Sequence, residues 1–164
     1  LYVDCILSAQ HADGGWSMAG ASDPDMTAMA LQALAPYRTQ TKAADAVERG
    51  LACLAALQAD DGGFASQGTA SAESCAQVLT ALSVLGTADD ARFAKAGGSV
   101  TDALLRFQLA DGSFCHVSGG GSNEMATEQA LYALAALQRA RSGADGLYRM
   151  SGAPDLCARP AAAA

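Results

Sequence analysis

The sequence predicts an all-α fold built from three helical hairpins, and three observations support this prediction. Hydrophobic residues make up 51% of the 164 residues while aromatic residues make up only 5%, so alanine and leucine supply most of the apolar content. One short motif recurs three times at nearly constant spacing, and good helix-capping residues precede three apolar segments. Small side chains let helix axes approach closely, which favours packed helices.

The repeated motif is a glutamine, an Asp-Gly turn and an aromatic residue. The glutamines stand at positions 10, 58 and 108, so the period is close to 50 residues. The motif residues are Gln10, Asp13, Gly15 and Trp16, then Gln58, Asp61, Gly63 and Phe64, then Gln108, Asp111 and Phe114. In the third copy Ser113 replaces the second glycine. A repeat of this size cannot bury its apolar face alone, so the three copies are expected to stack.

Each repeat is expected to contain an outer helix before the motif and an inner helix after it. Before the second motif, residues 44–58 place apolar side chains at three- and four-residue steps, the pattern of a half-buried helix. The Asp-Gly turn then ends the helix, because glycine accepts a left-handed backbone. The inner helices follow Ser, Asp or Asn caps and are expected at residues 24–36, 72–85 and 124–141.

These elements divide the chain into three repeats and a tail. The inner helices are apolar around most of their circumference, so each is expected to pack on more than one side. The segment after the third repeat is rich in alanine and proline and is interpreted as a tail or linker. The repeats span about residues 1–40, 41–90 and 91–150, and the tail spans 151–164.

The segment from Arg49 to Phe64 resembles the prenyltransferase/squalene-oxidase repeat of terpenoid cyclases and protein prenyltransferases. In that family a basic residue and a glycine precede an apolar stretch, a glutamine and a Gly-x-aromatic turn, as they do here. The resemblance implies that residues 1–150 form half of an α/α toroid, in which each glutamine and aromatic residue ties neighbouring hairpins together. It also implies that an N-terminal half upstream of Leu1, or self-association, closes the ring.

Two further segments look most similar to bacterial secreted and cell-surface repeat proteins and to the toroid of the vitamin-B12 carriers. They are Ala72–Leu82 and Met125–Leu134. This resemblance implies an extracellular or cell-surface location and a small hydrophobic or corrinoid-like ligand. The five cysteines include no CxxC pair, which argues against zinc ribbons and leaves the cysteines as core residues or disulfide partners.

The catalytic motifs of the resembling enzymes are incomplete. The Asp23-Pro24-Asp25 segment lacks the third aspartate of the cyclase motif and is better interpreted as a helix cap. One Trp, four Tyr and four Phe supply few rings for an aromatic cavity that stabilises carbocations. Zinc is a weak alternative, because Glu73, Cys75 and His116 could contribute ligands but the expected inner-helix histidine is missing. No phosphate-binding loop is present in the sequence.

The inner-helix starts are instead expected to form a polar rim over an apolar floor, as in many ligand sites. The candidate residues are Asp25, Thr27, Glu73, Ser74, Asn123, Glu124 and Thr127. The alternative is that these residues only cap three helices. A net charge of −7 argues against nucleic acid and anionic membranes as partners, and no apolar run approaches the roughly 20 residues of a membrane helix.

The sequence therefore predicts a non-catalytic ligand-binding or scaffold module of a bacterial secreted or cell-surface protein. No cofactor is expected, with a cobalamin-like ligand or zinc as weak alternatives. The alternative function is an isoprenoid enzyme, similar to a terpene cyclase or prenyltransferase, whose catalytic residues lie in a missing half.

Overall fold

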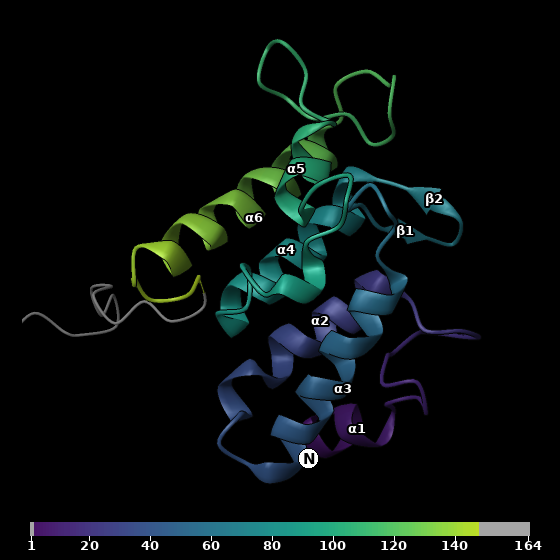
Figure 1. Ribbon diagram of the computed structural model, residues 1–164, viewed down its shortest axis with the longest axis vertical. Helices are drawn as coiled ribbons and strands as arrows, with labels where there is room; N and C mark the ends of the chain where they lie inside the picture. The colour runs from purple at the N-terminus through teal and green to yellow at the C-terminus, as the bar shows by residue number, and fades with distance from the viewer. Residues whose placement is uncertain (1, 148–164) are drawn as a thin grey trace, which may run out of the picture.

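The computed structural model describes residues 2–147, and this part of the chain is mostly helical (Figure 1). Its α-helices are α1 (Tyr2–Ser8), α2 (Pro24–Leu34), α3 (Thr41–Leu57), α4 (Ala72–Leu85), α5 (Val100–Leu105) and α6 (Glu124–Arg141). Short 3-10 helices follow α2 and precede α5, at Ala35–Tyr37 and Ala91–Phe93. Two antiparallel strands of two residues each, β1 (Ala65–Ser66) and β2 (Thr69–Ala70), lie between the second Asp-Gly turn and α4. The predicted tail at 151–164 lies outside the described residues.

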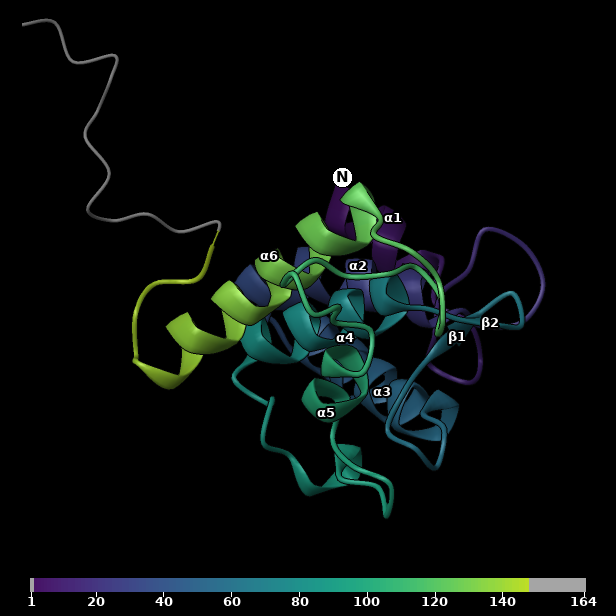
Figure 2. The same cartoon turned by 90° about the horizontal axis from the view of Figure 1, so that it is seen from above.

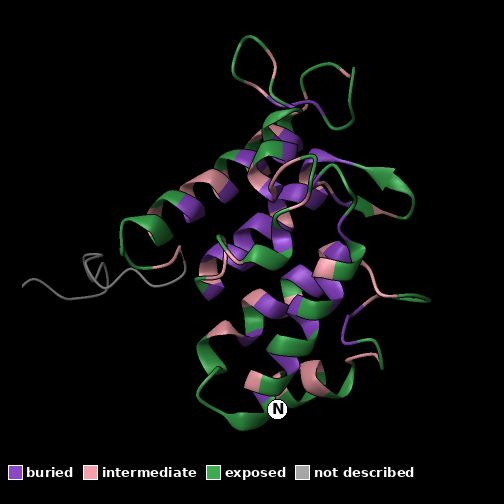
Figure 3. Ribbon diagram, in the orientation of Figure 1, coloured by how far each residue is buried: buried purple, intermediate pink, exposed green. Residues whose placement is uncertain are grey.

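Helices α2, α4 and α6 lie next to one another, and α4 packs against both α2 and α6 (Figures 1 and 2). Helix α3 packs on α2 and α5 packs on α4, while α1 contacts both α2 and α3. The inner helices of the prediction are therefore α2, α4 and α6, and the outer helices are α1, α3 and α5. Burial follows this order, since most of α4 is buried and α1 has no buried residue (Figure 3).

The inner helices begin at the predicted caps. The Asp23 carboxylate accepts hydrogen bonds from the backbone N–H groups of Asp25 and Met26. Ser71 accepts from the Ser74 N–H, and Asn123 accepts in the same way at the start of α6. Each cap satisfies backbone donors that have no partner within the helix. These bonds explain why the inner helices start where the sequence predicted.

The three motif turns share one backbone geometry, and we call residues 10–16, 58–64 and 108–114 turns 1, 2 and 3. In each turn the residue after the glutamine donates its N–H to the carbonyl four residues later, at 2.9, 3.0 and 2.7 Å. In each turn the aspartate accepts from the N–H two residues later, at 3.1, 2.8 and 3.0 Å. The glycine between them has φ near +90° in every copy, at Gly14, Gly62 and Gly112. The replacement of glycine by Ser113 leaves this geometry intact.

The aromatic residue of each turn is buried against its own inner helix. Trp16, Phe64 and Phe114 are 4%, 1% and 0% exposed. The Trp16 N–H donates to the Thr27 hydroxyl, and the Phe114 N–H donates to the Thr127 hydroxyl, both at 2.9 Å. Cys75 occupies the equivalent place behind Phe64, where its sulfur interacts with the Phe64 backbone. The turn is therefore fixed to the inner helix in all three repeats.

The motif glutamines join successive repeats, as predicted, in two of the three copies. The Gln10 amide donates to the Gly14 carbonyl of its own turn and to the Ala46 carbonyl of α3, both at 2.8 Å. The Gln58 amide donates to the Gly62 carbonyl of turn 2 at 2.9 Å and to the Phe93 carbonyl, in the segment before α5, at 3.1 Å. The Gln108 side chain is exposed and makes no such bond within residues 2–147, so the prediction is wrong for the third copy.

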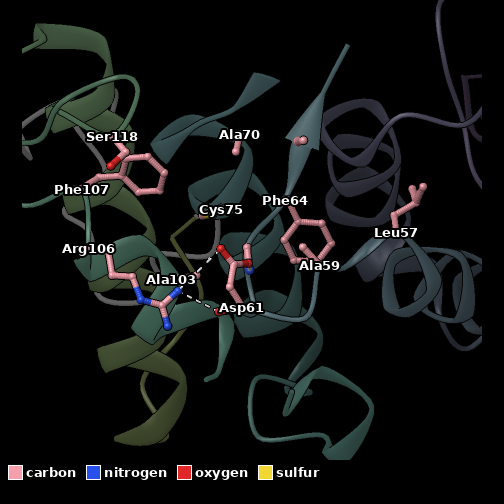
Figure 4. A pocket seen from close by; sticks show the side chains of 12 residues that line it. Leu57, Ala59, Asp61, Phe64, Ala70, Cys75, Ala103, Arg106, Phe107 and Ser118 are labelled. Carbon is pink, nitrogen blue, oxygen red and sulfur yellow. Dashed lines mark hydrogen bonds and ion pairs between the residues drawn. The ribbon is translucent and has the colours of Figure 1, made fainter. Parts of the chain in front are cut away.

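Arginine side chains of the following repeat contact the first two turns as well. Arg49 of α3 donates to the Gln10 side chain. Arg106, just after α5, donates to the Asp61 carbonyl at 2.8 Å, and Figure 4 shows its guanidinium pointing at turn 2. Each of these turns is thus held by its own repeat and by the next one.

Candidate functional site

An open depression of about 550 Å³ lies where the first turns of the inner helices meet. We call it the inner depression. It is lined from α2, α4 and α6 by Asp25, Met29, Glu73, Gln77, Met125 and Gln129, with Ser74 beside them and the β1–β2 segment and His116 at its edge. A neighbouring hollow of about 660 Å³ shares Asp25, Ser66 and Gln67 with it. The caps fix the first turns that carry Asp25, Glu73 and Ser74, and the packing of α2, α4 and α6 brings the other side chains beside them.

Asp25 is the acidic residue of this site whose carboxyl pKa is shifted from its ordinary value. Burial raises the pKa of its carboxyl, and the negative charges of Asp23 and Glu73 raise it further, while the Ser74 hydroxyl opposes the shift. One carboxylate oxygen, Oδ1, is buried without a hydrogen-bond partner among the described residues. A buried acceptor without a partner is costly, so a ligand that donates a hydrogen bond or carries positive charge would stabilise it.

Glu73 and His116 are joined by a side-chain hydrogen bond that crosses between two repeats. Glu73 Oε2 lies 2.8 Å from His116 Nδ1, and the two side chains are 13% and 51% exposed. The His116 carbonyl also accepts the Ala72 N–H at 3.0 Å, which fixes the loop after turn 3 to the start of α4. The pair holds the Glu73 carboxylate at the wall of the depression.

A row of glutamines connects the three inner helices along the same side. The Gln32 amide donates to Gln77 Oε1 at 3.2 Å, and the Gln77 amide donates to Gln129 Oε1 at 3.2 Å. Each side-chain amide has two donor hydrogens, so donors remain at the depression. Met29 and Met125 are 51% and 63% exposed there, and their flexible thioethers can adapt to an apolar surface.

The structure brings together some of the predicted site residues and separates the others. Asp25, Glu73 and Ser74 line the inner depression. Thr27 is completely buried, and Thr127 bonds the Phe114 backbone, so both threonines hold turns. The two remaining candidates lie at the start of α6 outside the lining, because Asn123 caps that helix and Glu124 is exposed in its first turn.

Sequence reasoning missed the glutamine row and the methionines. The alignment of the repeats carried a signal for Gln77 and Gln129, since they stand two residues after the equivalent positions Cys75 and Thr127. His116 was considered only as a metal ligand. Its contact with Glu73 depends on the path of the loop after turn 3, which is two residues longer than the equivalent loops of the other repeats.

The zinc alternative finds no support at Glu73, Cys75 and His116. Burial raises the pKa of the Cys75 thiol to about 11, so the thiolate form that binds zinc is disfavoured. The sulfur also contacts the Phe64 backbone and does not join the Glu73–His116 pair. Within residues 2–147 no group of three or more His, Cys, Asp or Glu side chains could hold a metal ion.

A serine, a histidine and an aspartate also meet beside turn 1. Ser22 Oγ lies 3.2 Å from His11 Nδ1 and donates to Asp13 Oδ1 at 2.6 Å. This bond, followed by that from the Gly15 N–H, lowers the pKa of Asp13. In a nucleophilic triad the carboxylate orients the histidine and the serine donates to the histidine. Here the carboxylate accepts the serine hydrogen itself, so the group stabilises the turn and does not activate a nucleophile.

A smaller pocket of about 240 Å³ lies between turn 2 and α5 (Figure 4). Its walls are mainly apolar and include Phe64 and Phe107. Its charged groups are Asp61 and Arg106, which face each other with 3.9 Å between carboxylate and guanidinium. This pocket lies where one repeat packs on the next. The inner depression differs from it because some of its polar groups have unused hydrogen-bonding capacity.

The comparisons with known proteins add no relative. No protein-family model matches the chain, and no curated protein matches it. None of the helices within residues 2–147 has the length and apolarity needed to cross a bilayer.

Proposed function

We propose that this chain is a non-catalytic binding module of the α/α-toroid repeat type, and that it holds a small ligand in the inner depression. The observation that carries the proposal is the Asp25 carboxylate, whose buried oxygen has no partner at the wall of an open depression of about 550 Å³. Within residues 2–147 no group of three or more metal-ligating side chains is present, and the Ser22 hydroxyl beside His11 donates to Asp13. A concave surface with a few directed polar groups is typical of a ligand site.

The depression favours a ligand with both apolar surface and hydrogen-bond donors. Two exposed methionines provide apolar contact, and the carboxyl oxygens of Asp25 and Glu73 provide hydrogen-bond acceptors. A small hydrophobic or corrinoid-like ligand, which the sequence resemblance implies, fits this description when it carries amide or amine donors. The threefold repeat and its glutamine contacts support the toroid arrangement. A bacterial secreted or cell-surface location remains part of the same proposal.

Thermal shift measurements with a corrinoid bearing amide groups test this function. Ligand that binds only the folded chain raises the melting temperature by mass action. We expect the rise to disappear in the double variant Asp25→Asn, Glu73→Gln and to persist in Glu124→Gln, a matched change outside the lining. Native mass spectrometry should show one bound ligand per chain. Equal shifts in the wild type and in both variants would show that binding occurs elsewhere.

The second candidate function is an isoprenoid enzyme, and the raised pKa of Asp25 favours it. Burial raises the pKa of the Asp25 carboxyl, which favours the protonated form that a general acid needs. Against it, the lining of the inner depression contains no aromatic ring to stabilise a carbocation. Incubation with an isoprenyl diphosphate separates the two functions, because product formation that Asp25→Asn abolishes would establish the enzyme.

A further inference from the structure

Helix α1 exposes positions that are buried in both other outer helices. When the repeats are aligned on their glutamines, Tyr2 corresponds to Gly50 and Val100, and Cys5 corresponds to Cys53 and Ala103. Gly50 and Val100 are buried, whereas Tyr2 is 84% exposed. Cys53 and Ala103 are 6% and 2% exposed, whereas Cys5 is exposed.

The buried positions of α3 and α5 contact the turn of the preceding repeat. A Cβ added at Gly15 would lie 2.7 Å from the Cys53 sulfur, and one added at Gly63 would lie 3.8 Å from the Ala103 Cβ. A Cβ added at Gly50 would lie 3.0 Å from the Trp16 ring, so that helix and turn are in close contact. Helix α1 therefore presents the face with which an outer helix binds a preceding turn.

Within residues 2–147 no outer helix covers turn 3 in the way that α3 and α5 cover turns 1 and 2. A Cβ added at Gly14 would lie 2.5 Å from the Arg49 carbonyl, and one at Gly62 would lie 2.5 Å from the Gly98 carbonyl. The same addition at Gly112 meets no described residue within 4 Å, although its φ of +88° equals that of Gly62. Gln108 is likewise exposed, whereas Gln58 is 6% exposed and bonds the next repeat.

Helix α6 shows the same difference at its apolar surface. Leu31 of α2 and Leu79 of α4 are 0% and 1% exposed. Their equivalent on α6 is Leu131, which like them stands eight residues after the N-cap of its helix. Leu131 is 56% exposed. Turn 3 and the Leu131 side of α6 together form a surface that matches what α3 and α5 already cover elsewhere in the chain.

We propose that the α1 face of one chain binds the turn 3–α6 face of a second copy, head to tail. The contact resembles the arrangement in which α5 binds turn 2, where Val100 stands at the position equivalent to Tyr2, with Cys5 against Ser113 and Gln108 bonded to backbone of the second copy. In the same sequence alignment Leu1 corresponds to Arg49, so the proposed interface has no guanidinium equivalent to that of Arg49. A heterologous contact of this kind forms either a closed ring or an open chain of copies. It does not depend on a ligand in the inner depression.

Sedimentation of the chain in reducing buffer tests the proposal. The wild type should show a mass above the 16.5 kDa of one chain that grows with concentration. Tyr2→Glu and Leu131→Glu should each sediment as monomers, because a charge buried in an apolar contact is costly. Both residues are exposed in the single chain, so circular dichroism should show unchanged helix content. Met18→Glu is the matched control, since Met18 is 86% exposed and belongs to neither face.

Mixing the two variants distinguishes a head-to-tail contact from any other. Leu131→Glu retains an intact α1 face, and Tyr2→Glu retains an intact turn 3–α6 face. The mixture should therefore form a one-to-one heterodimer that grows no further, whereas each variant alone stays monomeric. A wild type that is monomeric at every concentration, variants that associate like the wild type, or a mixture without heterodimer would each overturn the proposal.

Discussion

Trp16 shows how one side chain holds two repeats together. Its indole N–H donates to the Ile6 carbonyl at 2.7 Å, and its ring contacts Gly50 of the next outer helix. Its backbone N–H is bonded to Thr27 on the inner helix. The side chain thus fills the space where three helices meet, with only 4% of it exposed.

Replacement of this tryptophan should therefore destabilise the fold strongly. Trp16→Ala removes a buried ring and leaves a cavity, which costs about 3 kcal/mol or more of unfolding free energy. Urea denaturation followed by circular dichroism measures the loss. Met18→Ala, at a position that is 86% exposed, is the control and should change the unfolding free energy by less than about 0.5 kcal/mol. Equal midpoints for the two variants would show that the ring does not join the repeats.

Asp25 should make stability fall as the pH rises. Because burial raises its pKa in the folded chain, the folded state retains a proton that the unfolded state has lost. In the window from its ordinary value of 3.8 up to the raised value, the unfolding free energy therefore decreases with pH. Asp25→Asn removes this contribution.

The difference between the wild type and Asp25→Asn isolates that effect from other acids. Asp13 and Asp90 have lowered pKa values, because Ser22 and Arg92 respectively stabilise their charged forms, and they act in the opposite direction below pH 3.8. Paired urea titrations across the window should show the wild type losing stability relative to the variant as pH increases. A constant difference would mean that Asp25 titrates normally in the folded chain.

At the scale of elements, alanine substitutions at two glycines distinguish the free-energy cost of a strained backbone from that of a steric contact. Gly62 and Gly112 share φ of +88°, so an alanine at either position incurs about 1–2 kcal/mol of strain. Only at Gly62 does the added Cβ meet the Gly98 carbonyl, at 2.5 Å. We expect Gly62→Ala to cost about 1–3 kcal/mol more than Gly112→Ala. Urea denaturation at low protein concentration measures both, and equal losses would contradict the close packing of α5 on turn 2.

The inner helices were predictable from sequence because local chemistry fixes their starts. Asp23, Ser71 and Asn123 cap α2, α4 and α6 with their own side chains, and a cap is visible in sequence. The outer helices were less predictable. The predicted helix at 44–58 begins earlier, at Thr41, without a side-chain cap, and α5 has only 6 residues, preceded by the glycines 97 and 98.

The candidate site was predictable only where its residues belong to the caps. Asp25, Glu73 and Ser74 stand in first turns, and the structure places them at the inner depression. Thr27 lies away from it and its hydroxyl bonds the Trp16 backbone, because a helix start alone does not show which side faces the turn. Gln77 and Gln129 lie deeper in their helices, and their contact depends on the spacing between α4 and α6.

At the scale of the whole molecule, burial decreases from the middle repeat towards both ends. Helix α4 is enclosed by α2, α5 and α6, whereas α1 contains no buried residue. In stacked repeats each unit is stabilised mainly by its neighbours, so an end helix has fewer contacts to lose when it opens. The sequence pattern of apolar residues around most of α2, α4 and α6 does not reveal this gradient, because it depends on position in the stack.

Native-state hydrogen exchange should show the same gradient. Amides of α4 should exchange only by global unfolding, whereas those of α1 should exchange by local opening with a much smaller free energy. Low urea concentrations distinguish the two routes, since global unfolding accelerates with denaturant and local opening does so little. Measurements on monomeric Leu131→Glu exclude any protection of α1 by a second copy. If α1 amides in that variant were protected as strongly as those of α4, the three repeats would unfold as one unit and the gradient in burial would not determine local stability.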